Sequence, residues 1–226
     1  MQQVEDLLDQ SVAAEGYLIK APYVETEEGQ YIDLSAIDFD ALAEKFKTGK
    51  KRTINEKLQS AVRNKVMKMV KLNRTRIDYL ERFQELIDKY NSGSLNAEQF
   101  FNELKKFADN LTEEEHRTVS EQLTEEELVI FDLLTKPDIE LTATERQTVK
   151  TTARELLQTL KDKSLVIDWR KRQQSRAQVK VTIETELDKG LPRAYTPEVF
   201  KAKAEALFQH FYDSYQDVTK SIYTVA

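Results

Sequence analysis

The chain has 226 residues, no cysteine and a net charge of −6. The absence of cysteine excludes disulfide bonds and thiolate metal sites, and because no run of about 18 apolar residues exists, no membrane span is expected. The acidic start MQQVEDLLDQ lacks the apolar stretch of a secretion signal. Because this signal is missing, we expect a cytoplasmic protein. The start also reads like the end of a helix entered midway, so we expect the chain to be part of something longer.

Charge is strongly segregated along the chain. Residues 1–44 carry eleven acidic residues and one lysine, whereas residues 45–76 carry twelve Lys and Arg and only Glu56 as an acid. Residues 77–160 are acidic again, with nineteen acids and nine bases, and residues 161–193 have nine bases and five acids. Such blocks influence partner choice more than the fold. Either the acidic first segment folds back on the basic block, or that block faces a polyanion.

Apolar residues recur at helical spacing over most of the sequence. The pattern predicts helices over 1–14, 39–48, 54–90, 97–123, 125–135, 143–160, 165–187 and 197–211. The third of these is interrupted at residues 73–76, which leaves one bent helix or two. Helix starts are indicated by Asp38, Asn96 and Thr196, and by capping boxes at Thr53–Glu56, Thr124–Glu127 and Thr142–Glu145.

Residues 16–34 break the helical period and favour extended structure or a short hairpin, because glycines, a proline, tyrosines and isoleucines interrupt them. The sequence therefore predicts an all-α fold of about seven or eight irregularly packed helices. Its expected organisation is a partly extended acidic lead-in over residues 1–50, followed by a helical domain over residues 51–226.

The only tryptophan lies in the basic stretch 165–187, whose length suits a helix. At 100° per residue, Arg172, Arg176 and Lys180 share the face that carries Trp169. Long cationic side chains on an apolar face must extend to solvent, pair with buried carboxylates or meet an anionic partner. The residues alone leave all three open, and the partner in the last case is a phosphate or an acidic protein.

Residue patterns for catalysis are missing from the sequence. No G-x-x-x-x-G-K-[ST] phosphate loop exists, and neither His116 nor His210 has a partner histidine at ligand spacing. Pro137-Asp138 is not followed by the Glu-x-Lys that a PD…ExK nuclease core needs. We therefore expect no catalytic residue, no metal ligand and no cofactor in this chain, and an autonomous enzyme is the weakest hypothesis.

Five segments, in this order and spacing, resemble one known family. They are NRTRIDYLERFQELIDKYNSG (73–93), LTEEELVIFDLL (123–134), LTATERQTVKTTARELLQTLK (141–161), DWRKRQQSRAQV (168–179) and LPRAY (191–195). Together they resemble the C-terminal helical region of the endonuclease/motor (R) subunit of type I restriction–modification enzymes. The resemblance covers roughly residues 50–220.

The resemblance implies a function that the composition does not give. In that family the R subunit carries a nuclease domain and two ATP-driven helicase-like motor domains upstream, and this region helps to dock the motor onto the methyltransferase core and to hold DNA. The implied partners are the methyltransferase core, double-stranded DNA and the rest of the same motor subunit, with no membrane. ATP and Mg²⁺ are implied for the full-length subunit only.

By motif match, the family-like positions are Asn73, Arg74, Arg76, Asp168, Trp169, Arg176 and Ala177. With the basic block added, the candidate DNA-contacting or partner-contacting residues are Lys65, Lys68, Lys71, Asn73, Arg74, Arg76, Arg172, Arg176 and Lys180. Asp168 and Trp169 are expected to be structural anchors. The competing hypothesis is a pure protein–protein scaffold with no DNA contact, in which every basic block pairs with an acidic protein surface. The salt dependence of DNA binding separates the two.

Overall fold

The computed structural model describes residues 37–49, 51–137 and 139–224, and this part of the chain is all-α apart from one small hairpin. The helices are α2 (Phe39–Thr48), α3 (Lys51–Leu72), the 3-10 turn η2 (Arg74–Arg76), α4 (Ile77–Asn91), α5 (Ala97–Glu121), α6 (Glu125–Thr135), α7 (Ala143–Lys163), α8 (Gln173–Gly190) and α9 (Pro197–Ser214). The predicted fold class is confirmed. The helix expected over 1–14 and the hairpin expected within 16–34 lie outside the described residues.

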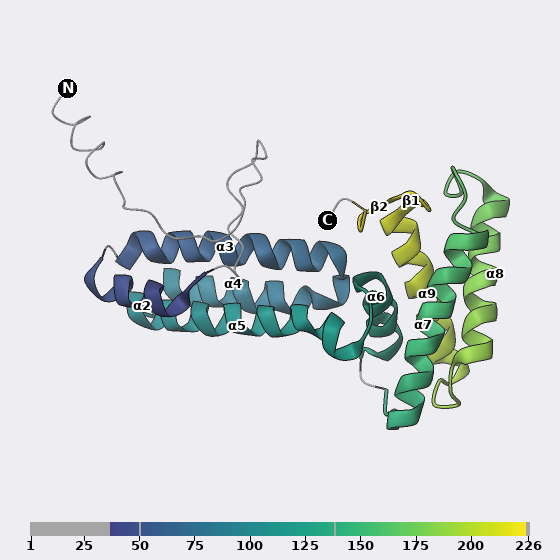
Figure 1. The fold of residues 1–226 in the computed structure, drawn as a ribbon, viewed down its shortest axis with the longest axis horizontal. Coiled ribbons are helices and arrows are strands. Elements are labelled where there is room, and N and C mark those ends of the chain that lie inside the picture. Colours follow the sequence, from purple (N-terminus) through teal and green to yellow (C-terminus); the bar gives the residue numbers. More distant parts are fainter. Residues whose placement is uncertain (1–36, 50, 138, 225–226) are drawn as a thin grey trace.

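Helices α2 to α5 form an elongated half of the molecule, which we call the arm (residues 37–121). In Figure 1 the long helices α3, α4 and α5 lie side by side along the horizontal axis, and α2 packs beside them near one end. Their facing sides build one apolar cluster, whose members include Leu58, Val62, Val66, Phe83, Phe100, Leu104 and Leu111. Each arm helix buries one stripe and leaves the opposite side exposed, as expected for amphipathic helices.

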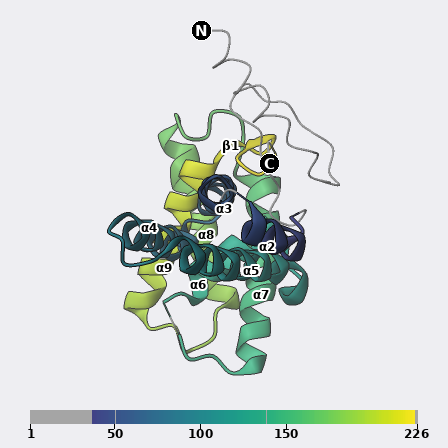
Figure 2. The ribbon, with the colours of Figure 1, turned by 90° about the vertical axis from the view of Figure 1, so that its left-hand side faces the viewer.

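The second half, the head (residues 123–224), contains α6 to α9 and a second apolar cluster built around Leu128, Phe131, Leu156, Trp169, Ile183 and Phe211. A two-stranded antiparallel hairpin, β1 (Tyr215–Asp217) and β2 (Lys220–Ser221), follows α9. Figure 2 looks along the arm and shows its helices end-on in front of the upright α7, α8 and α9. The arm therefore runs crosswise to the helices of the head.

Helix starts follow the predicted side-chain caps in most places. The Asp38 carboxylate accepts the Ala41 amide at 2.9 Å, at the start of α2. Asn96, Thr124 and Thr142 each complete a capping box at α5, α6 and α7, and Thr196 caps α9 ahead of Pro197. The predicted box at Thr53 is wrong, because α3 already begins at Lys51 and Thr53 lies within its first turn.

Three other expectations are settled by the structure. The stretch 54–90 is two helices, because Asn73 adopts an extended conformation and caps a 3-10 turn between α3 and α4. The helix after Asn96 runs unbroken to Glu121. The predicted helix over 165–187 is wrong in its first part: α8 begins at Gln173, and Trp169 lies in the preceding turns. Asp168 has a φ of +58°, a left-handed conformation that interrupts a right-handed helix.

Candidate nucleic-acid and partner interface

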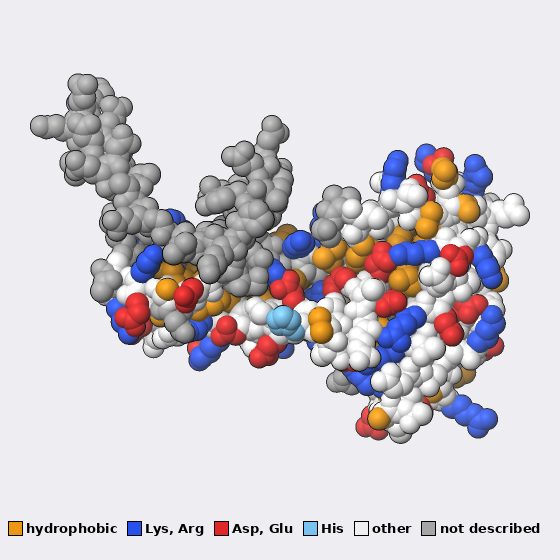
Figure 3. All heavy atoms as spheres, in the orientation of Figure 1, with side chains coloured by type: hydrophobic (Ala, Val, Ile, Leu, Met, Phe, Trp, Pro, Cys, Tyr) orange, Lys and Arg blue, Asp and Glu red, His pale blue; other side chains and the backbone are white. Residues whose placement is uncertain are grey.

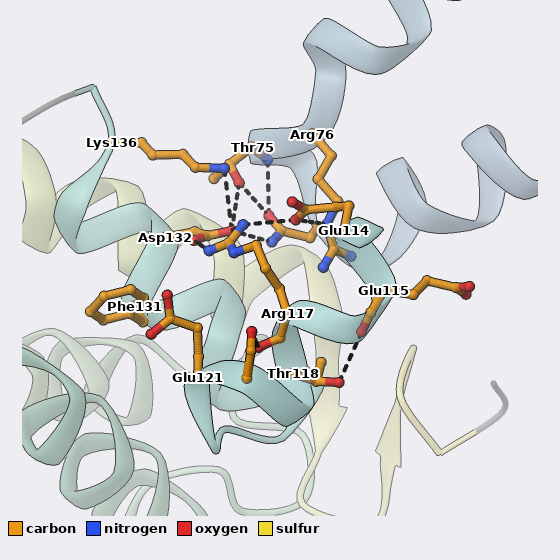
Figure 4. A network of polar contacts seen from close by, with 12 residues as sticks. Thr75, Arg76, Glu114, Glu115, Arg117, Thr118, Glu121, Phe131, Asp132 and Lys136 are labelled. Atoms are coloured by element: carbon orange, nitrogen blue, oxygen red, sulfur yellow. Dashed lines mark hydrogen bonds and ion pairs between the residues drawn. The ribbon is translucent and has the colours of Figure 1, made fainter. Parts of the chain in front are cut away.

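Arm and head meet at a buried ionic network formed by η2, the end of α5 and α6 (Figure 4). The Asn73 side-chain amide donates to Asp132 Oδ2 at 2.9 Å, and both side chains are fully buried. The Arg117 guanidinium also donates to Asp132, and Lys136 lies 3.4 Å from the same carboxylate. Burial alone raises the pKa of Asp132, but the hydrogen bond and charge of Arg117, together with the charge of Lys136 and the hydrogen bond from Asn73, hold that pKa below its usual range.

Arg76 continues this network deeper into the molecule. Its side chain is 2% exposed, and its Nε donates to Glu114 Oε1 at 2.9 Å. A second carboxylate, Glu125 at the start of α6, pairs with the other end of the guanidinium. Arg117 reaches the same Glu114 at 2.7 Å, so the two arginines share one carboxylate. We call this set the joint: Asn73, Arg76, Glu114, Arg117, Asp132 and Glu125. Asn73 and Arg76 were predicted contact residues, and the structure gives both of them structural partners.

The end of the chain forms a second bridge between arm and head. The Tyr223 hydroxyl donates to the Leu72 carbonyl at 2.8 Å and lies 3.2 Å from His210 Nε2. Arg74, which is 73% exposed, reaches Asp213 of α9 at 2.9 Å. Burial, with a smaller contribution from the Arg74 guanidinium, lowers the pKa of His210 to about 4, so this imidazole is neutral at neutral pH.

The exposed side of α3 carries several cations that form no ion pair within the described residues. Lys65 is mostly buried and pairs with Glu115 of α5. Arg63, Lys68 and Lys71, in contrast, are exposed, although the Arg63 guanidinium lies 6.0 Å from the centre of the Phe83 ring. Within the described residues these three cations form no ion pair. We call this surface the α3 face.

The predicted cations of α8 contact the head itself. Arg176 Nη1 donates to the Arg170 carbonyl at 2.6 Å. Lys180 pairs with Glu205 of α9 at 3.0 Å and lies 4.4 Å from the centre of the Phe208 ring. Arg172 is the exposed residue before the first turn of α8 and makes no side-chain cap. The predicted common face with Trp169 is therefore wrong, because Trp169 precedes the helix.

Trp169 and Asp168 build a rigid corner between α7 and α8. The indole is completely buried, and its Nε1 donates to the Tyr215 carbonyl at 3.2 Å. The Nε of Arg170 donates to the same oxygen at 2.6 Å. Asp168 holds the left-handed position of the corner and pairs with Lys171 at 2.8 Å. Asp168 and Trp169 therefore lie together in this corner, and their role as structural anchors stays a prediction.

Sequence reasoning missed the carboxylates of the joint. Asp132 is the informative one, because it lies within the apolar run LVIFDLL. A charged residue inside a buried run needs a partner, so the run signals an internal ion pair but does not identify its cation. Glu114 and Glu125 sit in acidic runs and carry no such signal.

The described residues include no cluster of three or more His, Cys, Asp or Glu that could hold a metal ion. Within that same part of the chain, no helix has the length and apolar character needed to cross a membrane. The fold is thus a two-part helical domain with an ionic joint and an uncommitted cationic face.

A family model matches residues 1–216, and its description is "Type I restriction enzyme HindI endonuclease subunit-like, C-terminal". The chain belongs to this family of C-terminal domains, as its motifs predicted. The matched range includes the acidic first 50 residues, which lie outside the motif resemblance. No curated protein and no solved structure matched the chain.

Proposed function

We propose that this chain is a non-catalytic C-terminal domain of a type I restriction endonuclease subunit, which joins that subunit to the methyltransferase core and contacts DNA. The observation that carries the DNA contact is the α3 face, where Arg63, Lys68 and Lys71 are exposed and form no ion pair within the described residues. Uncommitted cations on one face of a long helix suit the phosphates of a duplex, which position a protein without reading its sequence.

Five other predicted contact residues already have partners within the fold, so the proposed DNA surface is smaller than the one expected from the sequence alone. Asn73 and Arg76 hold the joint, and Lys65 pairs within the arm. Arg176 and Lys180 contact the head. Withdrawing any of them from these partners would cost hydrogen bonds or leave a buried carboxylate unpaired. The proposal therefore assigns phosphate contact to the α3 face alone. Arg74, at the end of that face, pairs with Asp213, and Arg172 lies apart from it on the head.

We also propose partners, a location and cofactors for the domain. Its partners are the methyltransferase core, double-stranded DNA and the rest of the same motor subunit, in the cytoplasm. ATP and Mg²⁺ serve the full-length subunit, and this chain binds no cofactor. The alternative is a pure protein–protein scaffold, in which the α3 face meets an acidic protein surface.

The test is DNA binding by the Lys68→Gln/Lys71→Gln variant as a function of salt. Two lost phosphate contacts should reduce the slope of log K against log salt by about two units, equally for unrelated DNA sequences. The matched control lies on the head. There, Arg193→Gln/Lys201→Gln removes two exposed charges and should leave the slope unchanged.

Circular dichroism should show that both variants are folded. An unchanged slope and affinity in the folded Lys68→Gln/Lys71→Gln variant would refute the DNA contact and favour the scaffold. An equal loss in both double variants would instead show a diffuse charge effect with no special role for the α3 face.

A further inference from the structure

Three β-branched apolar side chains gather at one end of the head. Ile167 is 74% exposed, Val166 is 47% exposed and Val218 is 43% exposed. The first two lie in the turn between α7 and α8, and the third lies in the turn between β1 and β2. The Val218 amide donates to the Leu165 carbonyl at 3.0 Å, so the two turns lie side by side. We call these three residues the tip.

The tip is connected to the structure beneath it by hydrogen bonds. Trp169 is fully buried directly after the turn, and its Nε1 and the Nε of Arg170 both donate to the Tyr215 carbonyl, at the start of the hairpin. The Asp217 carboxylate accepts the amides of Thr219 and Lys220, which closes the second turn. A surface that is ordered before binding loses little conformational entropy when a partner docks.

Charged side chains of both signs lie around the tip, among them the carboxylates of Asp162 and Asp168. Lys163, at the end of α7, and Lys220, in β2, are exposed, and neither forms an ion pair within the described residues. Lys171 is also exposed and pairs with Asp168. Figure 3 shows orange side chains between blue ones at the upper right end of the molecule, where α7 passes into α8. An apolar centre with a charged rim is the usual anatomy of a protein interface.

We propose that the tip is a docking surface for another protein subunit, whose apolar pocket receives Ile167 and whose rim carries carboxylates opposite Lys163 and Lys220. This inference rests on the proposed function, because it takes the methyltransferase core as the partner. The rim of the pocket is expected to carry carboxylates because these would pair with the exposed ammonium groups of Lys163 and Lys220. A protein fits better than a membrane, because the tip has no Trp or Phe, the residues that typically insert at a lipid interface. The family also names this domain as part of a subunit.

The experiment measures binding of the full chain to the purified methyltransferase core of the same restriction system. Ile167→Glu places a charge in the proposed pocket and should weaken binding by at least about 30-fold, as for the centre of an interface. The matched control is Val119→Glu on α5, where the native side chain is 75% exposed and far from the tip in sequence and fold. It should bind like the wild type, and both variants should melt like the wild type because each native side chain is largely exposed.

The rim is tested separately with Lys163→Gln/Lys220→Gln. Loss of two rim charges should slow association several-fold and weaken its salt dependence, with little change in dissociation. Substitution by glutamine keeps a polar side chain of nearly the same length, so the main change is the loss of charge.

The outcomes separate the two proposals. If the wild type binds the methyltransferase core and Ile167→Glu binds equally well, the tip proposal is wrong and the proposed assembly function stands. If the wild type does not bind the core, both are wrong. Binding to vesicles of anionic lipid that is lost in Ile167→Glu, with unchanged binding to the core, would overturn the protein partner in favour of a membrane surface.

Discussion

The arm and the head each contain one basic stretch of the sequence, residues 45–76 and residues 161–193. The main helices of these stretches, α3 and α8, differ in what their cations contact. In the arm, α3 packs on other helices along one side only, so Lys68 and Lys71 extend from its solvent side. In the head, α8 packs between α7 and α9, so Arg176 and Lys180 reach groups of the head itself.

The difference shows that a count of charges along a sequence does not measure the charge available to a partner. A cation is available to a partner when its helix is buried on one side only and its charged group reaches no carboxylate or carbonyl of the same chain. The same comparison locates the apolar contact surface in the head, at the tip, and the cationic surface in the arm. The proposed protein partner and the proposed DNA therefore meet different parts of the molecule, and the joint fixes how those parts are oriented.

The largest expected loss of stability comes from changing Trp169, the buried residue in the corner between α7 and α8. Trp169→Ala should lower the free energy of unfolding by about 3–5 kcal/mol, because the buried indole leaves a cavity. It also removes the hydrogen bond to the Tyr215 carbonyl. Urea unfolding measures the loss, and Ile167→Ala, two residues away and exposed, should change stability by less than about 0.5 kcal/mol. Equal losses in the two variants would show that the indole is not the anchor of this corner.

A substitution in the joint should cause the next largest loss of stability, because the joint is a buried ionic network between two apolar cores. Asp132→Asn should cost about 3 kcal/mol, the lower end of the cost of breaking a buried pair, since asparagine still accepts a hydrogen bond while Arg117 loses one of its two carboxylate partners and keeps Glu114. Asp78→Asn makes the same change in an exposed pair with Arg82 and should cost less than about 0.5 kcal/mol. A neutral result at Asp132 would mean that this carboxylate does not hold the arm to the head.

Acid should weaken the second bridge between arm and head before it weakens the joint. The pKa of His210 is lowered to about 4, below its unfolded value of about 6.5, so stability from the neutral imidazole is present above about pH 6.5 and lost as the pH falls toward 4. Between pH 7 and pH 4.5 the loss should reach about 2–3 kcal/mol. Arg74 opposes protonation of this histidine and Asp213 favours it.

His210→Gln isolates that effect, because glutamine does not titrate and can still bond to Tyr223. Its stability should fall less steeply than that of the wild type over this range in urea titrations at fixed salt. Parallel curves for the two proteins would contradict a desolvated histidine. The pKa of Asp132 is also lowered, so its contribution is present above the unfolded value of about 4 and is lost only at more acidic pH.

Sequence patterns predicted most of the helices because caps and apolar periodicity are local properties. Thr124 and Thr142 cap helices as predicted. The patterns failed where a long-range contact decides the structure: Trp169 bonds to the carbonyl of Tyr215, 46 residues away, and this contact fits turns better than a helix. The partners of Arg76 were equally out of reach, since Glu114 and Glu125 lie 38 and 49 residues further along the chain.

The tip illustrates a second limit of sequence reasoning. Val166 and Ile167 look like core residues, because aliphatic side chains beside a tryptophan are usually buried together. Only the left-handed corner at Asp168 turns them outward while the indole points inward. The α3 face was predictable as a basic block, whereas the division between uncommitted Lys68 and paired Lys65 depends on Glu115 of the neighbouring helix.

The smallest expected effect distinguishes two neighbouring arginines of the head. Arg176→Gln should cost about 1 kcal/mol, because it removes a charge-assisted hydrogen bond to the Arg170 carbonyl. Arg172→Gln should change stability by less than about 0.5 kcal/mol, because that side chain is exposed and caps no backbone group. Thermal melts of the two single variants, beside a DNA titration of each, make the comparison. If Arg172→Gln lowers the salt slope as much as the change of one α3 lysine does, the head also contacts phosphate, and the division of cations between arm and head is wrong at this residue. If only Arg176→Gln changes the melt and neither changes the slope, Arg176 is structural, as its hydrogen bond indicates, and Arg172 does not contact phosphate.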